Sequence, residues 1–259
     1  MTRGFFLLVL LFSLPALAGD IPLPAHAGDI PLAERRSGFD FMGSESQAMQ
    51  RDDTLNPGML WVAEGEALWR QGERSCASCH TDGSMRGVAA RYPAYDEKTQ
   101  QPIDLSGQIN RCRSERQGQA AYAPESRPLL SLTAYIGQQS RGLPLAPPED
   151  ARLKPFIERG RAAFERRIGQ LNFSCAQCHE QNWGQKLGGS PIPQGHANGY
   201  PIYRLEWQGL GSLQRRLRNC MIGVRAEPHA FGAPELVELE LYLAQRAKGM
   251  AMETPAVRP

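Results

Sequence analysis

Apolar residues recur at helical spacing at two matching places in the 259-residue chain. Side chains at positions i, i+4 and i+7 share one face of a helix, so a set at this spacing predicts a short amphipathic helix. A set at i, i+3 and i+4 further along predicts a second helix. The first kind of set is Leu105, Ile109 and Cys112, and again Leu213, Leu217 and Cys220; the second kind is Leu132, Tyr135 and Ile136, and again Leu239, Tyr242 and Leu243.

These sets belong to a larger frame that occurs twice. A Tyr-Pro dipeptide at 92–93 recurs at 200–201, at the same offset of 108 positions that separates Cys112 from Cys220. We therefore expect two related units, each with a helix, a cysteine motif, an irregular loop, a short helix and a final helix. The Pro-rich connector between them favours neither a helix nor a central strand. The predicted boundaries are an N-terminal extension at 28–49, a first domain at 50–140, a linker at 141–154 and a second domain at 155–259.

The N-terminus predicts an export signal. Arg3 precedes an apolar run at 5–12 that is too short to span a bilayer, and small residues follow at two places that fit signal cleavage. We predict a signal peptide at 1–27, with cleavage after Ala18 as the alternative, and a mature protein in the periplasm. No later stretch is long and apolar enough for a membrane span. The net charge of +2 gives no reason to expect a nucleic acid partner.

Two Cys-x-x-Cys-His motifs carry the clearest chemistry. This spacing is the attachment signature of c-type haem, in which two thiols bind the haem and the following histidine ligates the iron. A four-cysteine zinc site would leave both histidines without a role, and thioredoxin-like pairs do not account for them either. Two covalently bound c-type haems are therefore expected. The motif residues are Cys76, Cys79 and His80 in the first unit, and Cys175, Cys178 and His179 in the second.

Each unit has one further cysteine, at the end of its short amphipathic helix. The first unit offers no well-placed methionine, so Cys112 and Cys220 are the candidates for the second axial ligand of each iron. Two alternatives stay open: a disulfide between them, which an exported protein permits, or inert buried thiols. Met221 is a rival ligand for the second iron, and His196 and His229 are weaker ones.

The two cysteines differ in the charge around them. Aligned on the cysteines, Gln108 and Asn110 of the first unit correspond to Arg216 and Arg218 of the second. Arg216 precedes Cys220 by one helical turn and is expected beside it. Neighbouring cations favour a thiolate, and guanidinium binds oxyanions through paired donors. Arg216 and Arg218 are therefore candidate anion-binding residues, although they could instead pair with haem propionates or face solvent.

The two haem motifs, the two additional cysteines and the element from Arg216 to Cys220 together resemble the dihaem SoxA cytochromes of the sulfur-oxidising system. The resemblance covers essentially the whole mature chain. It implies a mainly α fold of two class I cytochrome c-like domains, related by internal duplication, with long irregular loops around the haems.

The resemblance also implies an activity, that of an L-cysteine S-thiosulfotransferase. A SoxX-like monohaem cytochrome would complete a heterodimer, which couples thiosulfate to a cysteine of a SoxYZ-like carrier protein and passes electrons to a cytochrome c acceptor. By resemblance, His80 and Cys112 ligate the first haem and His179 and Cys220 the second. Cys220 would carry a persulfide, and Arg216 would bind substrate. The alternatives are a dihaem thiosulfate dehydrogenase that forms tetrathionate, or an electron-transfer protein without catalysis.

Overall fold

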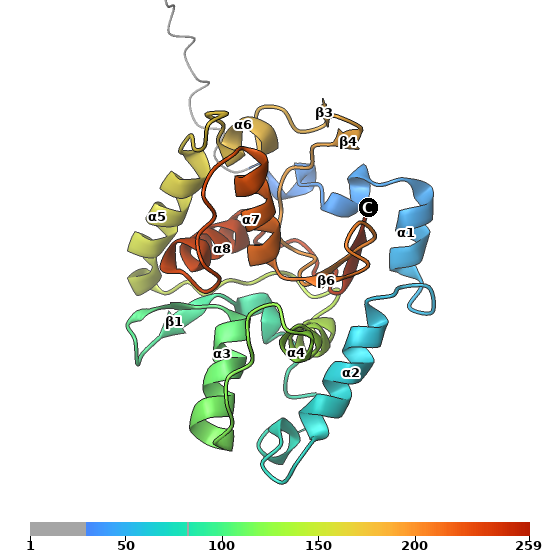
Figure 1. Ribbon diagram of the computed structural model, residues 1–259, viewed down its shortest axis with the longest axis vertical. Coiled ribbons are helices and arrows are strands. Elements are labelled where there is room, and N and C mark those ends of the chain that lie inside the picture. The colour runs from blue at the N-terminus through green and yellow to red at the C-terminus, as the bar shows by residue number, and fades with distance from the viewer. Residues whose placement is uncertain (1–29, 82) are drawn as a thin grey trace, which may run out of the picture.

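In the computed structural model, residues 30–81 and 83–259 form a chain with more helix than strand, and its two halves lie against each other (Figure 1). The signal peptide predicted at 1–27 lies outside the described residues. Among the helices of the two described ranges, none combines the length and the apolar character that a membrane crossing needs.

A packed helix pair forms the framework of each half. In the first half α2 (Met59–Arg70) packs against α4 (Arg127–Gln138), and in the second half α5 (Lys154–Glu165) packs against α8 (Pro234–Arg246). Proline in the first turn of α4, α5 and α8 has a backbone angle suited to a helix start. The expected final helices are confirmed, since their predicted apolar faces are buried: Leu132 and Ile136 on α4, and Leu239 and Leu243 on α8.

A glycine allows the close approach of the two helices in each pair. A Cβ atom at Gly65 of α2 would lie 2.0 Å from the carbonyl oxygen of Ser131 on α4. A Cβ atom at Gly160 of α5 would lie 2.1 Å from the carbonyl oxygen of Glu238 on α8. Any larger residue at either glycine would therefore force the two backbones apart.

The two short amphipathic helices are also present. α3 (Leu105–Cys112) ends on its cysteine as expected, whereas α7 (Leu213–Gly223) continues for three residues beyond Cys220. Each helix starts at a side-chain cap: an Asp104 oxygen accepts a hydrogen bond from the Gly107 amide, and Ser212 Oγ accepts one from the Arg215 amide.

Short strands interrupt the expected irregular loops at four places. Three hairpins and a C-terminal strand interrupt the loops, and the C-terminal strand pairs in parallel with the second half's hairpin. The strands are two or three residues long, too short to show an alternating pattern in the sequence. They are β1 (Ala94–Asp96) with β2 (Gln101–Ile103), β3 (Lys186–Leu187) with β4 (Ser190–Pro191), β5 (Ile202–Arg204) with β6 (Gly209–Gly211), and β7 (Ala256–Arg258) beside β5.

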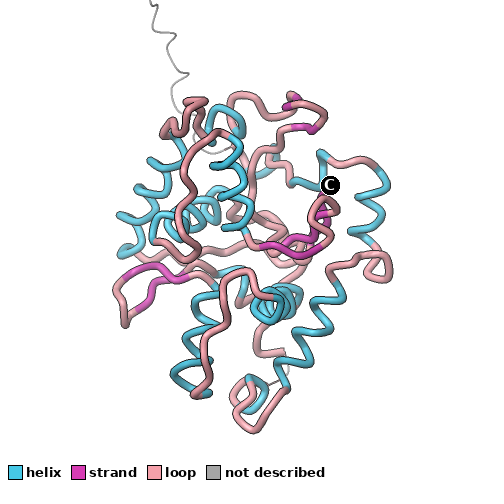
Figure 2. Tube along the Cα trace, viewed as in Figure 1, coloured by secondary structure: helices cyan, strands magenta, loops and turns pink. Residues whose placement is uncertain are grey.

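The N-terminal segment packs on the C-terminal strand of the chain. α1 (Ser44–Arg51) contacts β7, and the Gln50 side-chain oxygen accepts a hydrogen bond from the Val257 amide at 3.0 Å. The boundary predicted at residue 50 therefore falls inside a helix. Figure 2 shows short helical turns along the remaining loops. The short turns are η1 (Leu32–Glu34), η2 (Gly38–Phe41), η3 (Cys76–Ser78), η4 (Ala89–Arg91), the π-helix η5 (Arg113–Gln117) and η6 (Ala151–Leu153). The cysteine motif of the second half forms the short helix α6 (Cys175–His179).

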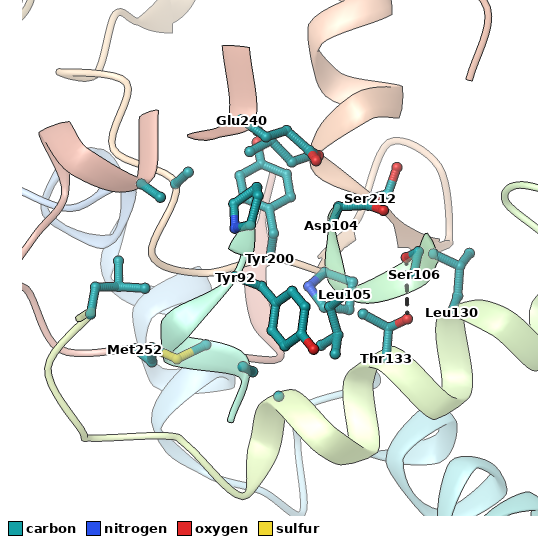
Figure 3. Close-up of a pocket in the computed structure, with 18 residues that line it drawn as sticks. Tyr92, Asp104, Leu105, Ser106, Leu130, Thr133, Tyr200, Ser212, Glu240 and Met252 are labelled. Atoms are coloured by element: carbon teal, nitrogen blue, oxygen red, sulfur yellow. Dashed lines mark hydrogen bonds between the residues drawn. The ribbon is translucent and has the colours of Figure 1, made fainter. Parts of the chain in front are cut away.

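A connector and a cavity lie between the halves. Residues 141–150 form neither a helix nor a regular strand, and the buried Leu145 donates its amide hydrogen to the carbonyl of Met250. Beside this connector, residues from both halves line a cavity of about 120 Å³ (Figure 3). Tyr92 of the first half and Tyr200 of the second both face it.

Candidate functional site

The loop behind His179 fixes the orientation of its imidazole. α6 starts at a capping box, in which Ser174 Oγ accepts from the Gln177 amide and the Gln177 side chain accepts from the Ser174 amide. His179 Nδ1 lies 2.7 Å from the carbonyl oxygen of Pro193 and donates to it. Gly195 lies against the ring, since a Cβ atom there would be 2.9 Å from His179 Cγ. This arrangement leaves Nε2 as the free nitrogen, as for a metal-ligating histidine.

Cys220 is within electrostatic range of both thiols of the second motif. Burial raises the pKa of Cys175 to about 12, and the neighbouring Cys220 adds to the shift. Burial and Cys220 likewise raise the pKa of Cys178. The structure thus brings two attachment thiols, an oriented imidazole and a further thiol into one neighbourhood. This donor set fits a covalently attached haem.

The rival ligands of the second iron lie at three different places. His196 follows Gly195 behind the His179 ring, and its Nε2 lies 3.1 Å from Gln194 Oε1. Met221 is the next residue after Cys220 on α7, so its side chain is turned by about 100° around the helix from the cysteine. His229 lies in the loop between α7 and α8.

The first motif has a similar set of groups but a more open histidine. Burial raises the pKa of Cys76, and Cys112 is close enough to add to the shift. Gln108 Nε2 lies 3.5 Å from Cys112 Sγ. The ring of His80 packs 5.6 Å from the Trp69 ring, but His80 is exposed, as is Cys79. All six cysteines are free, which excludes the disulfide between Cys112 and Cys220.

Arg216 shares the neighbourhood of Cys220. Burial lowers the pKa of His179, and the positive charge of Arg216 lowers it further, whereas the hydrogen bond that His179 donates to the Pro193 carbonyl raises it. Burial raises the pKa of Tyr200 to about 12, with Arg216 acting against this shift and Cys220 adding to it. Arg216, Tyr200 and Cys220 are therefore within electrostatic reach of one another and of His179.

The other arginines of α7 stack on aromatic rings. Arg215 lies 4.2 Å from the ring centroid of Trp207, and Arg218 lies 4.4 Å from that of Phe231. In the described part of the chain, Arg215, Arg216 and Arg218 form no ion pair. These three arginines of α7 are thus left without a carboxylate partner among the described residues.

In the first half the corresponding charge is neutralised. Arg111 donates hydrogen bonds to Asp96 and to the side chain of Gln108. The hydrogen bond from Thr99, together with Arg111, lowers the pKa of Asp96 to about 2, so this carboxylate stays ionised. Sequence reasoning missed this pair because its members lie on different elements, a strand and a helix. Sequence reasoning also missed Arg204. The repeat offset of 108 positions, which relates Arg204 to Asp96, could have drawn attention to it.

Comparison with known proteins places the chain in a family. A family model described as "SoxA/TsdA, cytochrome c domain" matches residues 64–145 and 159–252. The chain is 41% identical to a protein of Pseudaminobacter salicylatoxidans over 87% of this chain and 81% of that protein, and 37% identical to one of Rhodovulum sulfidophilum over 87% and 80%. Both relatives are named L-cysteine S-thiosulfotransferase subunit SoxA.

A solved structure supports the same placement. The crystal structure of SoxXA from P. pantotrophus matches with a TM-score of 0.83 and 35% identity, over 87% of this chain and 87% of that chain. Sequence family, relatives and fold agree. The chain therefore belongs to the SoxA family, with a cytochrome c domain that carries covalently bound haem c.

Proposed function

We propose that this chain is the haem-bearing subunit of an L-cysteine S-thiosulfotransferase. In the reaction, the thiol of a SoxYZ-like carrier protein and the terminal sulfur of thiosulfate form an S–S bond. The carrier S–H bond breaks, and one proton and two electrons leave. The names of the relatives support this activity.

One observation carries the proposal: Cys220 is within electrostatic range of the thiols of a haem-attachment motif, and Cys220 and Arg216 both act on Tyr200. Thiosulfate is a dianion, so unpaired guanidiniums attract and orient it next to a sulfur nucleophile. Cations near a thiol also favour its thiolate form. Cys220 is therefore the sulfur that we assign to the transfer, with Arg216 as the substrate-binding residue and Arg218 on the same helix.

We assign two haems to the chain. Cys175 and Cys178 would attach the second haem, with His179 and Cys220 as ligands; the corresponding group in the first half is Cys76, Cys79, His80 and Cys112. When bound, a haem supplies a one-electron acceptor near the reacting sulfur. The intact mass of the mature protein is expected to show two haems. Replacing either cysteine pair by serine should remove one haem, and a single haem in the unsubstituted protein would contradict the assignment.

We also infer that the two halves are cytochrome c-like domains that arose by duplication. Each helix pair crosses at a glycine and carries an aromatic contact: Trp69 lies 5.7 Å from Tyr135, and Phe164 lies 5.5 Å from Tyr242. The cavity between the halves is lined by matched residues of both. These pairs, at offsets of 107 or 108, include Ala89 and Ala197, Tyr92 and Tyr200, Leu105 and Leu213, Gly137 and Ala244, and Leu145 and Met252.

The proposed partners follow from the same family. The P. pantotrophus structure is titled SoxXA, which supports a SoxX-like monohaem cytochrome as the second subunit of a heterodimer. A cytochrome c acceptor would receive the electrons. The export signal predicted at 1–27 supports a periplasmic location.

Reconstitution tests the proposed function. The purified chain is mixed with a SoxX-like partner, a SoxYZ-like carrier, thiosulfate and oxidised cytochrome c, and the carrier is weighed by mass spectrometry. We expect one S-thiosulfonate group on the carrier cysteine for every two molecules of cytochrome c reduced. Tetrathionate formed without carrier would instead identify a thiosulfate dehydrogenase. Reduction of added cytochrome c by chemically reduced protein, with neither sulfur product, would identify an electron carrier.

A further inference from the structure

Arg204 is a mostly buried cation with an unused donor. It is the last residue of β5, and its side chain is 16% exposed. Its guanidinium lies 5.2 Å from the ring centroid of Trp207, and Nη2 lies 2.8 Å from an oxygen of Glu206. Nε is buried and has no hydrogen-bond partner in the described part of the chain. A buried charged N–H without an acceptor is costly, which points to an acceptor that binds there.

Arg204 also lies next to other positive charges. The guanidinium of Arg215 also packs on the Trp207 ring, 4.2 Å from its centroid. Arg216 is the next residue of α7. The β5–β6 hairpin leads directly into α7 (Figure 1). Burial lowers the pKa of Arg204, and Arg216 lowers it further, whereas Cys220 acts in the opposite direction. Glu206, the carboxylate that pairs with Arg204, is 65% exposed and is screened by solvent.

The first half shows that a haem motif does not by itself need these arginines. The residue that corresponds to Arg204 there is Asp96, and the residue that corresponds to Arg216 is Gln108. Asp96 pairs with Arg111, so the charge at this place is neutralised within the protein. In the second half, which contains Cys220, each of these two positions is an arginine. Arginine at both positions is therefore a feature of the half that contains Cys220.

We propose that Arg204 is a second anion-binding residue of the site, and that Arg204 and Arg216 together hold the sulfonate group of thiosulfate beside Cys220. Guanidinium donors match sulfonate oxygens in geometry and charge, and two of them can bind one sulfonate. The bound dianion offsets the repulsion between the two cations and accepts a hydrogen bond from the buried Nε. This inference rests on the proposed function and adds a residue to its substrate site.

The test compares Arg204→Ala and Arg204→Lys with a matched control, Arg127→Ala. Arg127 makes the same two kinds of contact in the first half: its guanidinium lies 4.5 Å from the Trp61 ring centroid, and its Nε lies 2.5 Å from a Glu64 oxygen. Steady-state kinetics of the reconstituted holocomplex give kcat and the KM for thiosulfate. Calorimetry with thiosulfate gives the affinity of the oxidised chain alone, and absorption spectra report the haems.

We expect Arg204→Ala to raise the KM for thiosulfate, and to weaken its binding, by at least about tenfold. Arg204→Lys, which keeps the charge and changes the geometry, should lie between wild type and Arg204→Ala, and Arg127→Ala should match wild type. Equal thiosulfate affinity in wild type and both Arg204 variants would overturn the proposal. So would a change in the haem spectrum or potential at unchanged KM, which would assign Arg204 to a haem propionate. Failure of wild type to modify the carrier would refute the proposed function instead.

Discussion

At two matched positions, a neutral or acidic side chain of the first half is replaced by arginine in the second. Asp96 corresponds to Arg204, and Gln108 corresponds to Arg216. Asp96 neutralises Arg111 in the first half. In the second half Arg216 has no ion-pair partner among the described residues, and Arg204 pairs only with the exposed Glu206. These few residues give two similar frames different chemistry.

Replacing Arg216 by the residue of the first half tests this difference. Arg216→Gln removes the charge and keeps a polar side chain on α7, so thiosulfate loses a charge-assisted contact. We expect kcat/KM for thiosulfate to fall by at least about tenfold, measured in the reconstituted complex. Arg113→Gln is the control, because Arg113 lies 3.6 Å from the Tyr122 ring beside Cys112. An equal loss in both variants would mean that general charge, rather than this position, matters.

At the scale of elements, much of the fold could be predicted. The helical spacing gave α3, α4, α7 and α8, and the repeated frame gave their order. The strands were missed because two or three residues carry no pattern. The packing of α1 on β7 was missed because it depends on residues about two hundred positions apart in the chain. The haem-binding residues were visible as a motif, whereas the roles of Pro193 and Arg204 depend on neighbours that only the fold brings close.

The glycines at which the paired helices approach each other should be essential to the stability of both pairs. Gly65→Ala and Gly160→Ala each place a methyl group against a backbone carbonyl, which cannot move without separating the helices. We expect each to lower the free energy of unfolding by about 1–3 kcal/mol or more, measured by thermal unfolding of the holoprotein.

A third helical glycine provides the control for these variants. Gly223 ends α7, and a Cβ atom there would meet no atom within 4 Å. Gly223→Ala should therefore leave stability unchanged or raise it by about 1 kcal/mol or less. If all three substitutions had the same effect, helix propensity rather than the close crossing would account for it.

At the scale of the whole molecule, two carboxyl groups lie where the halves meet (Figure 3). Asp104 comes from the first half and Glu240 from the second, and Gln214 Nε2 lies 3.5 Å and 3.4 Å from their oxygens. Burial raises the pKa of both, and for Glu240 the charge of Asp104 raises it further. A raised pKa means that the folded protein favours the protonated form.

This pair should make stability depend on pH. The contribution of protonated Glu240 is fully present below its ordinary pKa of 4.5 and is lost as pH rises through the raised value. Glu240→Gln cannot ionise, so we expect it to match wild type in acid and to unfold at a higher temperature than wild type in alkali. Glu235→Gln, on the exposed first turn of α8, should show no such trend. If the unfolding temperatures of wild type and Glu240→Gln changed with pH in the same way, Glu240 would not titrate as proposed.

The proposed chemistry takes place at the sulfur of Cys220, and Cys220→Ser tests it most directly. The variant is purified with its haems attached, combined with partner and carrier, and supplied with thiosulfate, and the carrier is weighed by mass spectrometry. The account predicts that the carrier gains no S-thiosulfonate group above background, although haem content and folding are unchanged. A carrier modified at the wild-type rate would contradict it.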